Sequence, residues 1–202
     1  MRLYISGIQA HMSLNEINLV TEKRRQRIKS YVRTEDKARC LVSGLLLRHF
    51  CGVTDEHQLT YGENGKPYLK DGSMYFNVSH SGDYVVLATA DREIGVDIEM
   101  ITPYPEAVAA RCFTPAELEW MRSERTDEAF FRLWTAKESV MKATGLGFIL
   151  PPETFCVLPM DSSAREIGGR AWLLNWHSFN GYMICAAIEG ESHDNDMRGL
   201  LL

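Results

Sequence analysis

The sequence predicts an α+β fold in two halves, each made of helices and an antiparallel sheet. The chain has 202 residues, whereas typical domains have ~100 to 150, so it can hold one core or two half-size units. Capped helices and strand-like runs occur both before and after Pro103. We therefore divide the chain into residues 1–102 and 103–202.

Residues typical of helix ends indicate where the first helices begin and end. Residues 2–9 are predicted to form a strand, and Ser13-x-x-Glu16 has the form of a capping box that opens a helix. A second helix is predicted to begin after Thr34 and to end at Gly52, because helices commonly end at glycine.

Strands follow in the rest of the first half. Two short strands flank the turn of residues 63–67. Residues 74–99 are rich in β-branched and aromatic side chains, and we predict that they form a meander of three strands.

The second half is predicted to begin with helices. The segment Thr114-Pro-Ala-Glu117 supplies an N-cap, a first-turn proline and a reaching glutamate for a helix that extends to about Ser123. A long helix is predicted from Asp127 to Gly145. Strands are then expected near residues 153–159, 170–177 and 181–188, followed by a polar tail.

Composition narrows the classes of protein. The formal net charge of −5 argues against nonspecific nucleic-acid binding. The five cysteines include no Cys-x-x-Cys pair, so we interpret them as small buried apolar residues of a reducing compartment. The first residues resemble a strand more than a signal peptide, and no apolar run approaches the ~20 residues of a membrane helix. We expect a cytoplasmic protein that binds neither membrane nor nucleic acid.

The segment Trp134-Thr-Ala-Lys-Glu138-Ser-Val-Met-Lys142 combines acid and base at helical spacing. Trp134, Glu138 and Lys142 are four residues apart and share one helical face. A carboxylate there suits a hard cation, and an ammonium suits a phosphate. An ordinary surface pair of Glu and Lys would explain the same spacing.

Two further motifs precede this helix. In Gly95-Val-Asp97-Ile-Glu99 the two acids point to one side of a strand. Oxygen ligands of this kind suit Mg²⁺, although a strand end facing water is the alternative. The block Phe76-Asn-Val-Ser79-His80-Ser-Gly ends in a hydroxyl-rich turn that can present Ser79 and His80 to an anion.

These three motifs, in this order and at these separations, resemble the 4′-phosphopantetheinyl transferases of the surfactin-synthetase-activating type. Gly65-Lys-Pro-Tyr68, Phe113-Thr-Pro-Ala-Glu117 and Glu35-Asp-Lys-Ala-Arg39 are similar to further family segments, so the resemblance covers roughly residues 20 to 150. It implies transfer of the phosphopantetheine arm of coenzyme A to a serine of an apo acyl or peptidyl carrier protein, with Mg²⁺, for which Mn²⁺ can substitute.

The family fold implies a pseudo-dimer of two similar halves with the active site between them. A shorter family type has one such half and assembles as a trimer, whereas this chain resembles the duplicated, monomeric type. No direct sequence repeat is visible between its halves.

The resemblance also implies roles for individual residues. Asp97, Glu99 and Glu138 are the expected metal ligands, and Lys142 is expected to neutralise the pyrophosphate. The expected contacts to coenzyme A come from Arg27, Arg39, Lys66, Pro67, Ser79, His80 and Lys142. Lys66 is assigned to the adenine and 3′-phosphate end. Cys40 occupies a place where relatives carry threonine, and sulfur is a poor donor for a phosphate.

The group that accepts the serine proton is left open. Glu117 resembles the base proposed for the family, yet it is also the N3 residue of a capping box. Glu138 or a metal-bound water are the alternatives. Two other functions compete with transfer: a binder of coenzyme A or carrier protein without turnover, and a metal-dependent phosphohydrolase.

Overall fold

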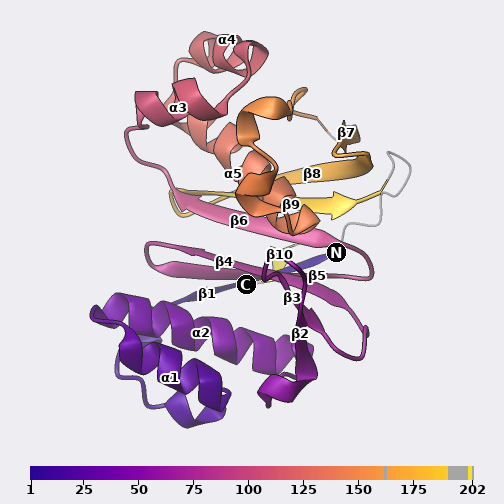
Figure 1. Cartoon of the computed structure of the whole chain (residues 1–202). Coiled ribbons are helices and arrows are strands. Elements are labelled where there is room, and N and C mark those ends of the chain that lie inside the picture. Colours follow the sequence, from indigo (N-terminus) through magenta and orange to yellow (C-terminus); the bar gives the residue numbers. More distant parts are fainter. Residues whose placement is uncertain (162, 191–199, 202) are drawn as a thin grey trace.

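The computed structural model describes residues 1–161, 163–190 and 200–201. In this part of the chain, two four-stranded sheets pack face to face, with helices on both outer sides (Figure 1). α1 and α2 cover the first sheet, and α3, α4 and α5 lie on the side of the second sheet. The architecture is therefore α+β, with two units that each combine helices and a sheet.

The first unit follows the predicted order of elements up to β5, although its first helix begins later in the chain than predicted. Its helices and strands are β1 (Arg2–Gly7), α1 (Glu22–Ser30), α2 (Thr34–Cys51), β2 (Leu59–Tyr61), β3 (Pro67–Leu69), β4 (Tyr75–Ser81) and β5 (Tyr84–Ala90). α2 ends at Gly52, which has a left-handed φ of 69°. β2 and β3 pair with each other in a small separate sheet.

The second unit contains the elements β6 (Ile94–Met100), α3 (Glu106–Cys112), α4 (Pro115–Glu124), α5 (Asp127–Thr144), β7 (Arg165–Ile167), β8 (Arg170–Phe179) and β9 (Tyr182–Glu189). Short 3₁₀ turns lie at Gln9–His11, Ile17–Leu19, Glu56–Gln58, Gly147–Ile149 and Pro152–Thr154. The capping box of Thr114 and Glu117 opens α4, and α5 ends at Gly145, as predicted.

The strand order is β10-β1-β5-β4 in the first sheet and β6-β9-β8-β7 in the second. Neighbouring strands are antiparallel, as expected, except that the short β10 (Leu200–Leu201) pairs with β1 in parallel. Residues 191–199 of the expected polar tail lie outside the described residues.

Three apolar clusters hold the layers together. One lies between the two sheets and includes Leu3, Val86, Ile98 and Ile184, each at most 2% exposed. A second joins α2 to the first sheet, and a third joins α5 to the second sheet. Burial of both faces of each sheet explains why β5 and β9 are almost continuously apolar.

Three predictions of secondary structure are wrong, and Cys156 is exposed, whereas all five cysteines were expected to be buried. No helix opens at Ser13, because the Glu16 carboxylate bonds the His11 ring, and α1 begins instead behind Thr21, whose hydroxyl accepts from the Arg24 amide. Residues 153–159 form no strand. The carbonyls of Pro152 and Phe155 accept hydrogen bonds from the Lys137 ammonium instead of from a neighbouring strand.

The third wrong prediction is the meander, because β6 leaves the first sheet after a short turn and pairs with β9. The other edge of β6 lies along β4, where side-chain hydrogen bonds take the place of the backbone hydrogen bonds of a sheet. The Asn77 side-chain oxygen accepts from the Val96 amide at 3.0 Å, and the Ser81 hydroxyl accepts from the Met100 amide at 3.2 Å. The edges of the two sheets therefore meet at a polar seam, although a division at residue 103 places β6 with the first half.

Candidate active site

An open pocket of about 410 Å³ lies at this seam. Its polar lining comes from β4, β6 and α5: Ser79, His80, Asp97, Glu99, Glu138 and Lys142. Strand alternation turns Asp97 and Glu99 to the same side, and helical spacing does the same for Glu138 and Lys142. The structure thus brings the residues of all three sequence motifs into one place.

Gly95 allows the helix and the strand to approach this closely. A Cβ at Gly95 would overlap the Ser139 carbonyl oxygen and the Ala143 amide of α5. α5 therefore lies directly on the backbone of β6, two residues before Asp97. This contact brings Glu138 and Lys142 opposite the acids of β6.

Asp97 is the centre of the polar contacts. It is 3% exposed, and its Oδ1 atom accepts from the Lys142 ammonium at 2.5 Å and from the Ser79 hydroxyl at 2.8 Å. Lys142 also donates to Ser79 at 2.9 Å. The second carboxylate oxygen, Oδ2, is buried and has no hydrogen-bond partner among the described residues.

The two neighbouring glutamates are disfavoured as anions. Burial raises the pKa of Glu99, and the charge of Asp97 raises it further, although Ser81 donates to Glu99 at 2.8 Å. Burial and the charge of Asp97 also raise the pKa of Glu138. Three acids in one pocket repel each other, and a cation would relieve this repulsion.

The residues fit a metal that takes part of its ligands from a substrate. Within the described ranges, no three His, Cys, Asp or Glu side chains are close enough to hold an ion by themselves. Mg²⁺ does not need such a cage, because it keeps several waters and binds one or two carboxylates plus substrate phosphate. The unpaired Oδ2 atom of Asp97 is a suitable ligand.

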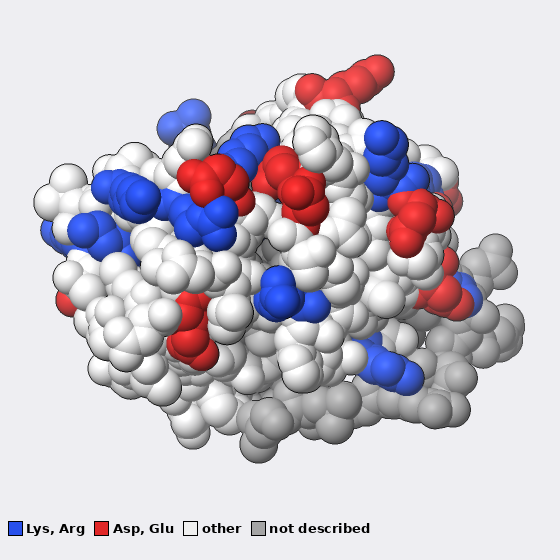
Figure 2. Space-filling view, turned by 90° about the horizontal axis from the view of Figure 1, so that it is seen from below, with Lys and Arg blue, Asp and Glu red and all other residues white. Residues whose placement is uncertain are grey.

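A second pocket, of about 280 Å³, adjoins the first and shares Val78 and His80 with it. Arg24, Arg27 and Arg39 line it, together with Tyr31, Cys40 and Pro67. α1 and α2 lie on the lower side of Figure 1, and the view from below shows several Lys and Arg side chains close together toward the left (Figure 2).

The arginines of this second pocket are held in place by their neighbours. Arg39 donates to the Asp36 carboxylate and to the Gly82 carbonyl, both at 2.6 Å. Arg27 donates to the Tyr31 hydroxyl at 3.0 Å. Arg24 passes over Gly44, where a Cβ would collide with its stem. The pocket is suited to a polyanion.

His80 lies where the two pockets meet. Loss of water contacts around its ring lowers the pKa of His80, and the charge of Arg39 lowers it further. The lowered pKa favours the neutral ring, in which one nitrogen donates a hydrogen bond and the other accepts one.

Two family models match the two units of the chain. Residues 93–187 match the 4′-phosphopantetheinyl transferase superfamily, and residues 9–92 match the N-terminal region of 4′-phosphopantetheinyl transferases. A 4′-phosphopantetheinyl transferase of Bacillus subtilis is 33% identical over 157 residues, which are 73% of this chain and 70% of that protein. The chain belongs to the 4′-phosphopantetheinyl transferase superfamily.

Other members of the superfamily are similarly related. The transferase Sfp of Bacillus subtilis strain 168 is 31% identical over 70% of this chain and 67% of its own length. The transferase gsp of Aneurinibacillus migulanus is 34% identical over 68% of this chain and 61% of its own length. The chain thus spans about two thirds of these relatives. No helix in the described part is long and apolar enough to cross a membrane.

Two residues that were expected in the active site, Glu117 and Lys66, do not line either pocket. The Glu117 carboxylate is fully buried and pairs with the Lys137 ammonium at 2.8 Å. It also accepts from the amides of Thr114 and Val157, so it holds α4 and the following loop to α5. Lys66 is buried as well, and its ammonium is enclosed by acceptors of the protein at the end of α5.

Sequence reasoning gave no individual role to three polar residues, Arg24, Ser81 and Lys137, although Arg24 belongs to the basic run of residues 23–29. Arg24 lies three positions before Arg27, and this spacing on one helical face could have indicated it. Ser81 follows Ser79 by two positions, as Glu99 follows Asp97, so alternation along the strand could have indicated Ser81. The position of Lys137, by contrast, depends on distant acceptors.

Proposed function

We propose that this protein transfers the 4′-phosphopantetheine arm of coenzyme A to a serine of an acyl or peptidyl carrier protein and releases adenosine 3′,5′-bisphosphate. One observation carries the proposal: an arginine-lined pocket opens beside an acidic pocket that contains a lysine, and His80 borders both. Coenzyme A has a 3′-phosphate and a pyrophosphate, and the two pockets suit these two groups.

The fold supports a site between two halves. β4 of the first sheet and β6 of the second line the same pocket, and α5 closes it. We propose that the two units form a pseudo-dimer, as in the family, with the nucleotide bound across the seam. Neither unit alone contains both the arginines and the acids.

The residues of the second pocket would hold the 3′-phosphate. Arg27 and Arg39 supply the charge, Pro67 borders the same pocket, and Arg24 adds a third guanidinium. Guanidinium groups bind phosphate through paired donors, so they can replace the contact that Cys40 does not provide. The pyrophosphate would then extend past His80 and Ser79 to Lys142.

Asp97, Glu99 and Glu138 would hold Mg²⁺, or Mn²⁺ in its place, together with the pyrophosphate. The ion would supply neutralisation of the phosphate charge. For that arrangement the Lys142 ammonium must leave Asp97 Oδ1 and turn to the phosphate. Its side chain is 30% exposed, so it has room for this movement.

The transfer exchanges one P–O bond for another. The serine oxygen bonds to the phosphorus that carries the pantetheine arm, the P–O bond to adenosine 3′,5′-bisphosphate breaks, and the serine loses its proton. Glu138 or a water molecule is the acceptor that this site offers. Glu117 is not, because it is fully buried in its pair with Lys137.

One experiment separates this function from its competitors. The protein is mixed with coenzyme A, Mg²⁺ and an apo carrier protein, and the intact mass of the carrier is measured. We expect a gain of one phosphopantetheine arm on the serine. Unmodified carrier and intact coenzyme A would indicate a binder, and nucleotide release without a carrier would indicate a phosphohydrolase.

The sequence does not reveal which carrier protein is modified. The same assay is therefore run with fatty-acid, polyketide and peptidyl carriers. A carrier whose serine is replaced by alanine is the matched control. Modification of that control would contradict transfer to serine.

A further inference from the structure

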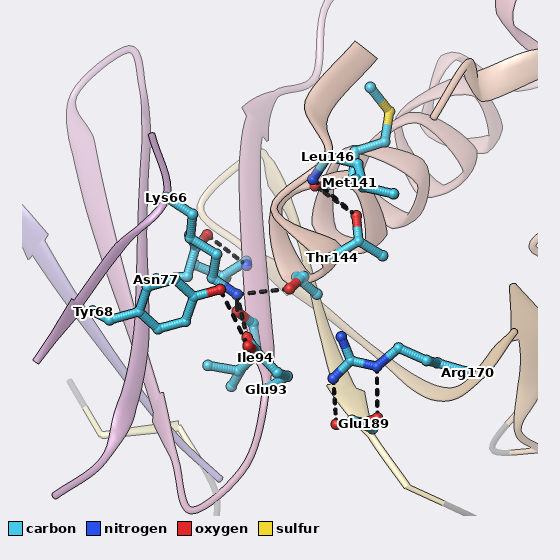
Figure 3. A network of polar contacts seen from close by, with 12 residues as sticks. Lys66, Tyr68, Asn77, Glu93, Ile94, Met141, Thr144, Leu146, Arg170 and Glu189 are labelled. Atoms are coloured by element: carbon cyan, nitrogen blue, oxygen red, sulfur yellow. Dashed lines mark hydrogen bonds and ion pairs between the residues drawn. The ribbon is translucent and has the colours of Figure 1, made fainter. Parts of the chain in front are cut away.

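Lys66 lies at the end of the seam, and its ammonium points to acceptors of the protein, among them Glu93 and Ile94 (Figure 3). Its side chain is 5% exposed. The Nζ atom donates to Glu93 Oε2 at 2.6 Å, to the Ala143 carbonyl at 2.7 Å and to the Ile94 carbonyl at 3.1 Å. An ammonium has three donors, so the protein itself uses all of them.

The backbone acceptors belong to the two elements that carry the acidic pocket. Ile94 is the first residue of β6, three positions before Asp97. Ala143 follows Lys142, and its carbonyl is among the last four of α5, which have no partner within the helix. A positive charge is favourable at a helix C-terminus. Lys66 therefore joins the start of β6 to the end of α5.

Neighbouring contacts fix the position of this ammonium. Glu93 accepts from the Tyr68 hydroxyl at 3.1 Å, which ties the pair to β3. The Lys66 stem lies against Gly145, where a Cβ would stand 3.4 Å from its Cδ atom. Gly145 has a φ of 70° and ends α5. The stem thus contacts the residue at which the helix stops.

We propose that Lys66 is a positioning residue that sets the distance between α5 and β6, and thereby holds Glu138 and Lys142 opposite Asp97. The inference rests on the proposed transfer activity. It differs from the expected contact with the adenine and 3′-phosphate end, since that contact would require the ammonium to give up three hydrogen bonds. Misplacement of reacting groups by ~1 Å can cost ~10²-fold in rate.

The test compares Lys66→Met with Arg27→Met, which removes a cation from the second pocket. For Lys66→Met we expect kcat to fall ~10-fold or more, with the Kd for coenzyme A within about twofold and the preference over 3′-dephospho-coenzyme A unchanged. For Arg27→Met we expect a weaker Kd and a smaller preference, because a guanidinium of the second pocket is lost. Calorimetry supplies the Kd values.

A second readout does not depend on activity. Amide hydrogen exchange should accelerate at residues 94–97 and 142–146 in Lys66→Met and stay unchanged in Arg27→Met. Either of two results would overturn the inference: a Lys66→Met protein with parental kcat, or one that loses affinity for coenzyme A together with the 3′-phosphate preference.

Lys66→Met leaves Glu93 without its cation, so Glu93→Gln is measured as a milder variant that keeps an oxygen acceptor for Lys66. It should show the same pattern with a smaller fall in kcat, and a parental kcat and exchange rate would also contradict the inference. A parent protein without transfer activity would contradict the proposed function instead. The two failures are therefore distinguishable.

Discussion

At the scale of single residues, the position of Lys142 suits a role in the transition state. It approaches Asp97 at 2.5 Å and lies one helical turn beyond Glu138, where it can meet a phosphate whose negative charge grows as the bond to the leaving group breaks. We expect Lys142→Met to lower kcat by ~10² to 10³, with a much smaller change in KM for coenzyme A. Steady-state kinetics on a carrier protein would measure both.

Lys29→Met, on the exposed side of α1, is the control for loss of one positive charge. If Lys142→Met raises KM and leaves kcat unchanged, Lys142 binds the substrate and the transition state equally well. If neither value changes, Lys142 pairs with Asp97 without taking part in the transfer.

Glu138 gives a prediction about stability and pH. Its pKa is raised in the folded state by burial and by Asp97, so the folded protein binds this proton more tightly than the unfolded chain. The stabilisation is complete below the unfolded pKa of about 4.3 and is lost as pH rises through the folded pKa. We expect Glu138→Gln to raise the free energy of unfolding at pH 7, with a smaller gain near pH 4, while transfer activity falls. Urea unfolding across this range would test it, and a less stable variant at pH 7 would contradict it.

Motif spacing could predict which acids share a pocket, because alternation in a strand and the four-residue repeat of a helix are local properties. It placed Asp97 with Glu99 and Glu138 with Lys142. It could not place the Lys66 ammonium or the partner of Glu117, since the acceptors of Lys66 include a carbonyl 77 positions later in the chain. Buried ammonium groups are positioned by such distant partners, which no local pattern reveals.

At the scale of elements, the contact of α5 with β6 depends on the missing side chain of Gly95. Any Cβ there overlaps backbone of α5, which cannot move like a flexible side chain. We expect Gly95→Ala to reduce the free energy of unfolding by ~1 to 3 kcal/mol, the usual cost of overpacking, and to lower transfer activity. Gly7→Ala is the matched control, because its Cβ would meet no heavy atom closer than 3.7 Å. Equal stability of the two variants would contradict the close contact.

The buried pair of Glu117 and Lys137 connects α4 to α5. Lys137 also donates to the Pro152 and Phe155 carbonyls at 2.7 and 2.6 Å, so it holds the loop after α5. We expect Glu117→Gln to cost ~3 to 5 kcal/mol of stability, because a buried ammonium loses its counterion. The kcat of the folded fraction should remain near that of the parent.

The double variant Glu117→Gln/Lys137→Met completes this comparison. It should recover part of the stability lost in Glu117→Gln, since it removes the unpaired charge as well. A stable Glu117→Gln protein without transfer activity would instead identify Glu117 as the base.

Helix ends were predictable where a capping residue or a glycine marks them, as at Thr114, Gly52 and Gly145. The sheet to which a strand belongs was not. β6 follows β5 closely in sequence, yet it pairs with β9, and its apolar side chains Val96 and Ile98 lie in the cluster between the two sheets. Pairing over such a distance depends on the packing of whole layers.

At the scale of the whole molecule, the layers of this one chain cover each other. The inner faces of both sheets cover each other, and helices cover both outer sides (Figure 1). Among the described residues, the large apolar side chains that stay exposed are Leu19, Val32, Tyr61, Met100, Leu146, Phe148 and Ile149. Stable interfaces bury ~800 Å² per partner through ~20 to 30 residues, more than such a set provides.

We therefore expect the protein to be a monomer of 23.0 kDa, with and without coenzyme A and Mg²⁺. Both sides of the seam pocket come from the same chain, so the transfer rate per molecule should not change on dilution. Sedimentation equilibrium over a hundredfold range of concentration measures the mass, and the carrier assay over the same range measures the rate. A mass of two or three chains, or a specific activity that falls on dilution, would show that a second copy completes the site. In that case the short family type, which assembles from single halves, would be the better guide to this protein.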